Sequence, residues 1–286
     1  MHLANPAGIQ KYKGLKHSDD RTDAFWLAEM LRLGILPVGY IYPKEERPVR
    51  DLLRKRGHLV RLRTSVINSL QNVITRSTGG FLSGDKMKQL RRDHVAQVLH
   101  GEEYLALTGS VSKKVIDTLT QQIKIIEKAA LKRVTVIPQY TCLTTIPGVG
   151  VVLGLTITLE TGDIGRFAGV GNYASYCRKV PVRWTSNDKK KGRGNKKNGN
   201  KYLSWAFAEA ADKARRYDAT AKAWYNRKLT KTNMLVARSA LAHKLARAAY
   251  HMMKEGQPFD EKRLFGYSVG PGGETGLGVG ETTRSD

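Results

Sequence analysis

Acidic residues are scarce in this chain of 286 residues, which has 25 Asp and Glu against 49 Lys and Arg and a formal net charge of +24. Such a surplus of positive charge opposes compaction and indicates a polyanionic partner. Nucleic acid is the first candidate, because Lys and Arg displace counterions from phosphates. An anionic membrane surface is the second.

Cysteines and long apolar runs are also scarce. The two cysteines, Cys142 and Cys177, are too few for a disulfide framework or a zinc site, and they indicate reduced thiols in a cytoplasmic protein. The most apolar run, GVGVVLGLTITL, is broken by Gly and Thr, whereas a membrane-spanning helix needs about 20 apolar residues. The N-terminal MHLANPAGIQKYKG has no apolar signal-peptide core. We therefore do not expect a membrane-spanning or a disulfide-stabilised secreted protein.

The first forty residues are typical of the end of an α/β unit. RTDAFWLAEMLRLG predicts a helix with Ala24, Leu27, Ala28 and Leu31 on one face, ended by Gly34. HLANP and GYIYP read as short extended segments. Because no further strand precedes them, a sheet here would lack partners.

Two long amphipathic helices are expected next, at about 45–76 and 103–134. The apolar seam of the first is Leu52, Leu59, Leu62, Val66, Leu70 and Val73, with an Arg-rich opposite face of Arg50, Arg54, Arg56, Arg61 and Arg63. The seam of the second is Val115, Leu119, Ile123, Ile126, Ala130 and Val134. Matching seams favour an antiparallel hairpin or coiled coil that serves as a packing device.

From Thr141 the pattern changes to shorter helices. LTTIPGVGVVLGLTITL reads as a helix–turn–helix with Pro147, Gly148 and Gly150 in the turn. That turn either offers backbone N–H groups to a DNA phosphate or is a plain αα turn. KYLSWAFAEAADKARRY and TNMLVARSALAHKLARAAYHMMK predict two Ala-rich helices, and the Gly-rich C-terminal tail is expected to be disordered.

A strongly basic loop precedes the first of these Ala-rich helices. It carries ten Lys or Arg, the candidate nucleic-acid-binding residues: Arg178, Lys179, Arg183, Lys189, Lys190, Lys191, Arg193, Lys196, Lys197 and Lys201. Ser186 and Asn187 lie among them. Ser-Asn is good turn chemistry, which favours a phosphate-binding loop. The alternative is a serine nucleophile held against a phosphodiester, because basic side chains stabilise charge at phosphorus.

Asp20 and Asp23 form the second candidate site, in HSDDRTDAF. Their spacing places both carboxylates on one side of a first helical turn. Oxygen clusters of this kind hold Mg²⁺, which can clamp a scissile phosphate. The alternative is that these acids cap the helix and favour its dipole.

A family resemblance joins these features. DIGRFAGVGNYASYCRKVPVRWTSNDKKKGRGNKKNGNKYLSWAFAEAA resembles the C-terminal domain of the Piv-like DEDD insertion-sequence transposases, some of which are guided by a bridge RNA. The resemblance extends through YNRKLTKTNMLVARSALAHKLARAAYHM and over the N-terminal residues, so that it covers about 1–265. It implies a RuvC-like RNase-H-fold domain, a helical coiled-coil linker and a mainly helical transposase domain.

The resemblance also implies roles for particular residues. Asp20 and Asp23 would be the last two acids of a Mg²⁺-binding tetrad, and Ser186 the nucleophile that cuts and rejoins DNA. The expected partners are DNA, in some members a guide RNA, and further copies of the chain as a dimer or tetramer. The expected division is 1–44 for the end of the RuvC-like α/β domain, 45–136 for the linker, 137–260 for the transposase domain and 261–286 for the tail.

This sequence departs from the family pattern at two points. Asp188 stands where the family has Gly, and an added carboxylate beside a phosphate site is repulsive. The first Asp and the Glu of the tetrad would lie before HLANP, so we expect an N-terminally truncated chain with an incomplete metal site. The alternative function is a catalytically inactive relic that still binds nucleic acid.

Overall fold

The computed structural model describes residues 2–9, 19–99, 101–134, 137–180, 183–186, 189–193 and 198–266. Helices make up most of this part of the chain. Their bounds are α1 (Pro6–Ile9), α2 (Asp20–Arg32), α3 (Arg47–Thr78), α4 (Gly84–Gln89), α5 (Arg92–Val98), α6 (Glu103–Val134), α7 (Pro138–Leu143), α8 (Val151–Thr161), α9 (Val170–Tyr176), α10 (Lys201–Tyr217), α11 (Ala219–Leu229), α12 (Met234–Glu255) and α13 (Glu261–Phe265). A 3₁₀ helix (Ile164–Arg166) and two strands, β1 (Arg183–Ser186) and β2 (Lys189–Arg193), complete the set.

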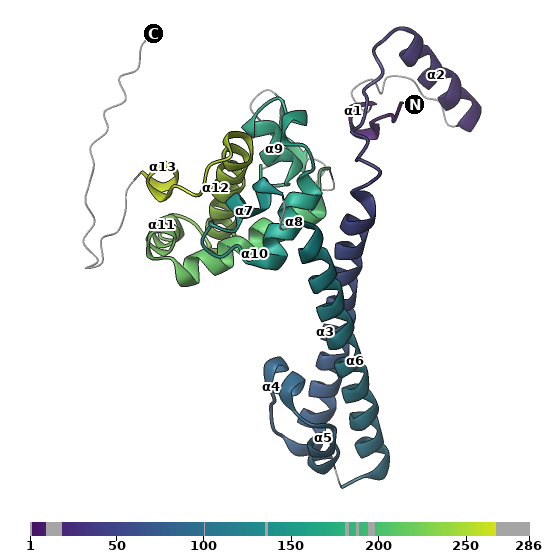
Figure 1. Ribbon diagram of the computed structural model, residues 1–286, viewed down its shortest axis with the longest axis vertical. Coiled ribbons are helices and arrows are strands. Elements are labelled where there is room, and N and C mark those ends of the chain that lie inside the picture. The colour runs from purple at the N-terminus through teal and green to yellow at the C-terminus, as the bar shows by residue number, and fades with distance from the viewer. Residues whose placement is uncertain are drawn as a thin grey trace.

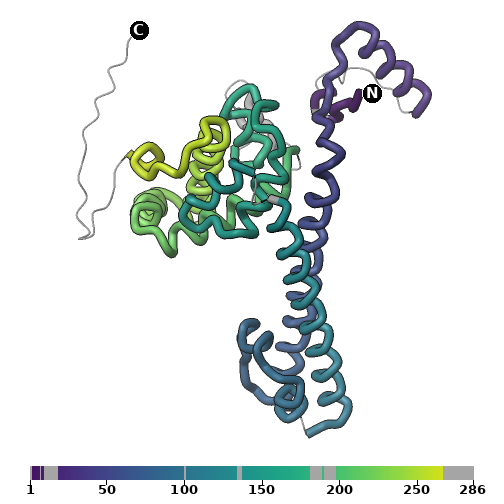
Figure 2. Tube along the Cα trace, in the orientation of Figure 1, coloured from purple at the N-terminus to yellow at the C-terminus, as the bar shows by residue number. Residues whose placement is uncertain are grey.

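A long hairpin of α3 and α6 forms the axis of the molecule (Figure 1). Helices α4 and α5 cover its lower end, where Ile67, Leu70, Ile74 and Ile116 form a buried cluster. Helices α7 to α13 gather beside its upper half, and α1 and α2 lie beyond the upper end of α3, as the tube in Figure 2 also shows. None of the described helices is long and apolar enough to cross a membrane.

The two long helices form where the apolar repeats predict them, but the predicted seams are partly wrong. Leu62 and Val115, assigned to the seams, are 43% and 40% exposed. The buried positions recur at intervals of seven instead, for example Ile116, Ile123 and Ala130 in α6. A seven-residue interval keeps one stripe of each helix against its partner.

The sequence analysis placed an Arg-rich face of α3 opposite the apolar seam, but part of that face contacts α6. Arg56 forms an ion pair with Glu127 of α6 at 2.7 Å. Arg63 donates to the Thr120 hydroxyl at 3.1 Å. Polar pairs therefore alternate with apolar layers along the interface, and a count of apolar residues alone does not reveal them.

The N-terminal segments form no sheet among the described residues. HLANP and the segment before GYIYP meet in a single antiparallel bridge between Ala4 and Val38. The apolar face expected for α2 is mostly uncovered, since only Met30 of that helix is buried and Leu31 is 46% exposed. The α/β remnant of a RuvC-like domain thus stays a prediction.

The largest core lies inside the helical body formed by α7 to α13. Small alanines of α10 and α12, among them Ala210 and Ala246, are fully buried and let the two helices approach closely. Both of the predicted Ala-rich helices are present, as α10 and α12. Helix α11 was not predicted, and Asp218 stands between it and α10 as its N-cap.

The end of the described chain also differs from the prediction. Residues 261–265, assigned to the disordered tail, form α13, and Phe265 is buried against the helical body. Residues 267–286 lie outside the described residues.

Candidate nucleic-acid interface

The basic segment forms a β-hairpin, where the sequence predicted an irregular loop. Strands β1 and β2 pair antiparallel, with Ser186 opposite Lys189 and Arg183 opposite Arg193, and the register shifts between Trp184 and Thr185. Lys, Gly and Asn have low strand propensity, so sequence alone favoured a loop. We call residues 183–193 the basic hairpin.

Both ends of the segment that carries the basic hairpin are tied together at one point. The Arg178 guanidinium donates from Nε and Nη2 to the Gly199 carbonyl, at 3.1 and 2.8 Å. The Asn200 N–H donates to the Tyr176 carbonyl at 2.6 Å. Gly199 has φ +88°, and a Cβ there would lie 2.5 Å from the Tyr176 carbonyl oxygen, so glycine is required. We call these four residues, Tyr176, Arg178, Gly199 and Asn200, the neck.

A buried carboxylate fixes the neck to the rest of the molecule. Glu160, at the end of α8, is 3% exposed. Its oxygens accept from Arg54 Nε at 2.6 Å, Arg54 Nη2 at 2.8 Å and Asn200 Nδ2 at 2.8 Å. The Asn200 side-chain oxygen in turn caps α10 by accepting from the N–H groups of Tyr202 and Leu203. Three distant segments of the chain therefore meet at one acid.

Glu160, Arg54 and Asn200 were not predicted from the sequence as part of the site. One signal was present: Glu160 is the sole charged residue in the apolar run that ends α8. A lone acid at such a position must find a partner, because an unpaired buried charge is strongly destabilising. Which of the many basic residues pairs with it could not be read from the sequence.

The ten predicted nucleic-acid-binding residues fall into three groups. Arg178, Lys179, Lys189 and Lys201 have described side chains, and Lys189 and Lys201 are exposed. The backbone alone is described for Arg183, Lys190, Lys191 and Arg193, and Lys196 and Lys197 lie outside the described residues.

Not all of the described cations are equally available to a phosphate. Arg178 is engaged at the neck. Burial lowers the pKa of the Lys179 ammonium. Lys189, at the start of β2, and Lys201, at the start of α10, are therefore the cations best placed to meet a ligand.

Ser186 is the last residue of β1, and its backbone pairs with Lys189 across the hairpin. Two residues, Asn187 and Asp188, separate the paired positions and lie outside the described residues. The Ser186 side chain is likewise outside the described part. The structure thus places the backbone of the predicted nucleophile in the basic hairpin, three residues from the exposed Lys189.

Asp20 and Asp23 lie in the exposed first turn of α2. The N-cap is the preceding Asp19, whose carboxylate accepts from the Thr22 N–H at 2.6 Å. Figure 1 draws α2 beyond the end of α3, apart from α9 and α10, which flank the basic segment. Within the described ranges no group of three or more His, Cys, Asp or Glu could hold a metal ion. Asp20 and Asp23 alone do not fit a Mg²⁺ site, because hard cations need more oxygen ligands.

The turn between α7 and α8 packs inward. Gly148 has φ +86°, and a Cβ there would lie 2.6 Å from the Ala214 nitrogen and 2.9 Å from the Ala210 carbonyl oxygen of α10. Val149 closes the turn by donating to the Ile146 carbonyl at 2.9 Å. These contacts favour the plain αα turn over a phosphate-binding one.

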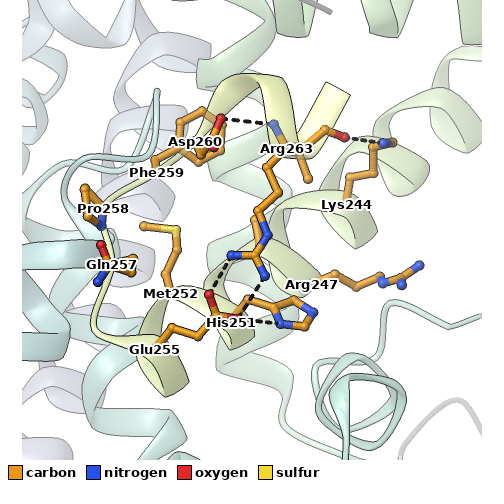
Figure 3. A pocket seen from close by; sticks show the side chains of 12 residues that line it. Lys244, Arg247, His251, Met252, Glu255, Gln257, Pro258, Phe259, Asp260 and Arg263 are labelled. Carbon is orange, nitrogen blue, oxygen red and sulfur yellow. Dashed lines mark hydrogen bonds and ion pairs between the residues drawn. The ribbon is translucent and has the colours of Figure 1, made fainter. Parts of the chain in front are cut away.

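A hollow of about 300 Å³ that several cations line lies between α12 and α13 (Figure 3). Its cations are partly engaged: Arg263 donates to both carboxylate oxygens of Glu255, at 2.5 and 2.9 Å, and lowers the pKa of Glu255 to about 2. Lys244 donates to the Leu264 carbonyl at 2.6 Å. This hollow is best explained as the place where α13 is fastened to α12.

Comparison with known proteins identifies the class to which this region is similar. Residues 140–226 match the model of the transposase IS116/IS110/IS902 family. The match runs from α7 into α11 and includes the neck and the basic hairpin. No curated protein matches the chain. The family match supports an insertion-sequence transposase, a DNA-recombining class of enzyme.

Proposed function

We propose that this protein is a Piv-like insertion-sequence recombinase that cuts and rejoins DNA through a phosphoserine linkage at Ser186. The observation that carries the proposal is the family match over residues 140–226, which contains the basic hairpin with Ser186 at the end of β1. The net charge of +24 supplies the attraction to DNA.

The reaction at Ser186 is a pair of transesterifications. The serine oxygen loses its proton and forms a bond to phosphorus, while a deoxyribose oxygen leaves the same phosphorus and takes up a proton. The energy of the phosphodiester is retained in the serine–phosphate bond. Attack by the deoxyribose hydroxyl of another strand then reverses the exchange and releases the serine.

The described residues contribute to this reaction by binding and positioning. Lys189, at the start of β2, and Lys201, at the start of α10, are exposed and can neutralise phosphates. The neck, held by Glu160 and Arg54, fixes the hairpin to α8, α10 and α3. A nucleophile carried on a fixed support reaches phosphorus with less loss of orientational freedom.

Three further expectations stay predictions. Mg²⁺ would require oxygen ligands in addition to Asp20 and Asp23. A guide RNA would be a second anionic ligand for the basic surface. A dimer or tetramer is expected because strand exchange needs more than one active site, and exposed apolar side chains such as Phe25, at 67% exposure, offer α2 a surface for packing.

The test is a covalent adduct assay with labelled duplex DNA that carries an insertion-sequence end. We expect a DNA-linked band on a denaturing gel, lost in Ser186→Ala and kept in Thr185→Ala, with duplex affinity nearly unchanged in both. An adduct that persists in Ser186→Ala would move the nucleophile elsewhere, with Thr185 next. Binding without any adduct in the unaltered chain would favour the inactive nucleic-acid-binding relic.

A further inference from the structure

A hollow of about 520 Å³ lies where the long hairpin meets the helical body. Its walls come from α3, α8 and α10, and α8 packs against both of the other helices. The hollow adjoins the neck, because Lys201 and Glu160 both line it. Its volume is within the range of about 300–1,000 Å³ that small-ligand sites occupy.

Part of the lining of the hollow is apolar and includes an exposed aromatic side chain. Leu53, Val60 and Val152 line it together with Trp205, which is 43% exposed. Tyr202 is less available, because the Arg54 guanidinium covers its ring at 4.7 Å from the centroid. Within the described residues Trp205 has no aromatic or cationic partner, so its ring is free to stack.

The rim of the hollow is positive. Arg54 and Arg56 are neutralised by Glu160 and Glu127. Arg61 is exposed and has no ion-pair partner in the described part of the chain, and Lys201 is also exposed. Arg61 and Lys201 thus line the same hollow as Trp205, and Lys201 also lies 5.2 Å from the Tyr202 ring centroid. Two cations and an exposed indole ring suit a phosphate next to a base.

The floor also has space that a side chain normally fills. Gly57 lines the hollow in the middle of α3, and a Cβ there would meet only the Arg61 Nη1 at 3.7 Å. A glycine within a helix costs about 0.5–1 kcal/mol relative to alanine. Gly57 therefore makes α3 less stable than alanine would, and it leaves the hollow open.

We propose that this hollow, at the junction of α3, α8 and α10, binds an unpaired nucleotide of single-stranded nucleic acid by stacking the base on Trp205 and holding its phosphate with Arg61 and Lys201. A base inside a duplex is covered on both faces and cannot enter such a site. An unpaired base exposes a face that can stack on an aromatic ring. The inference rests on the proposed function for the class of ligand, since strand exchange produces unpaired strands.

The test compares two DNA probes by fluorescence anisotropy at one fixed salt concentration. One is a fluorescein-labelled oligothymidine of about 12 nucleotides, a length typical of single-strand binding grooves. The other is a blunt duplex of the same length. We expect Trp205→Ala to weaken oligothymidine binding about 5- to 150-fold, as the loss of a base–aromatic stack does, and to leave duplex binding within about two-fold.

Two pairs of variants distinguish the loss of stacking from a general loss of stability. Trp205→Phe should retain most of the oligothymidine affinity, because phenylalanine also stacks. Gly57→Met should weaken oligothymidine binding by filling the hollow, whereas Gly57→Ala should not. Thermal unfolding of each variant shows whether the fold is retained.

Each outcome has one meaning. Equal loss for both probes, or no loss for oligothymidine, overturns the stacking site while the Ser186 adduct still stands. If the unaltered chain binds neither probe, the proposed nucleic-acid function is itself wrong. Loss confined to oligothymidine in Trp205→Ala and Gly57→Met supports the site.

Discussion

Arg54 of α3 and Glu160 of α8 face each other through two parallel hydrogen bonds, with Nε 2.6 Å from Oε1 and Nη2 2.8 Å from Oε2. The two residues are 106 positions apart in the chain. The pair joins the long hairpin to the helical body, and Asn200 extends it to the neck of the basic hairpin. This ion pair therefore contributes to the orientation of the candidate site.

We predict unequal effects when either partner of this pair is removed. Arg54→Ala leaves a buried carboxylate with only Asn200 and should destabilise the fold by about 3 kcal/mol, at the low end for a broken buried pair because Arg54 is partly exposed. Glu160→Gln leaves a cation that water can reach and should cost about 1–2 kcal/mol.

Urea unfolding followed by circular dichroism measures both changes. Lys55→Ala is the matched control, since Lys55 is the next residue of α3 and is exposed. Losses below about 0.5 kcal/mol for both variants, the range of ordinary surface substitutions, would contradict the role assigned to the pair.

The sequence predicted the helices well because their apolar repeats are long. It failed on which stripe is buried, because Arg63 meets Thr120 inside the interface and polar pairs leave no apolar signal. The contacts of Glu160 were also not predicted, because its pairing with Arg54, 106 residues away in the chain, depends on the fold. The candidate serine came from the resemblance, and no local pattern distinguishes Ser186 from a turn residue.

Binding to duplex DNA should depend steeply on salt. If six to ten phosphates are neutralised, affinity should fall about 10³- to 10⁵-fold between about 50 and 200 mM salt. Lys189→Ala should reduce the slope of log affinity against log salt by about 0.9, the contribution of one phosphate contact. Anisotropy titrations at several salt concentrations give that slope.

A lysine far from the hairpin controls this experiment. Lys86 is exposed on α4, which Figure 1 places at the opposite end of the long hairpin. Lys86→Ala should leave the slope unchanged. A flat salt dependence of the unaltered chain would remove the electrostatic argument, and equal slopes for the two variants would place the DNA elsewhere.

The fastening of α13 to α12 should loosen in acid. The Arg263 hydrogen bonds lower the pKa of Glu255 from its ordinary 4.5 to about 2. The ionised form of Glu255 therefore stabilises the folded state. A carboxyl group whose pKa is lowered by folding adds to the free energy of unfolding. That addition is complete above the pKa of the unfolded chain and is lost as the pH falls through the pKa of the folded chain. Carbon-13 NMR should show Glu255 titrating near 2 in the unaltered chain and nearer 4.5 in Arg263→Gln. Identical titrations in the two proteins would refute the contact.

Two glycines in the turn between α7 and α8 differ in conformation and surroundings. Gly148 has φ +86°, with α10 backbone atoms 2.6 and 2.9 Å from where a Cβ would lie. Gly150 has φ −86°, and no atom lies within 4 Å of its Cβ position. Gly148→Ala must therefore strain the turn and push α7 and α8 away from α10, whereas Gly150→Ala meets open space.

We expect Gly148→Ala to destabilise the fold by about 2–4 kcal/mol, the sum of an unfavourable left-handed backbone and an overpacked contact. Gly150→Ala should be neutral or stabilising by a few tenths of a kcal/mol up to about 1, because alanine restricts the unfolded chain. Urea unfolding of both variants measures the difference. If Gly148→Ala unfolds at the same urea concentration as Gly150→Ala, the turn does not pack on α10, and its backbone N–H groups would again be candidates for binding a DNA phosphate.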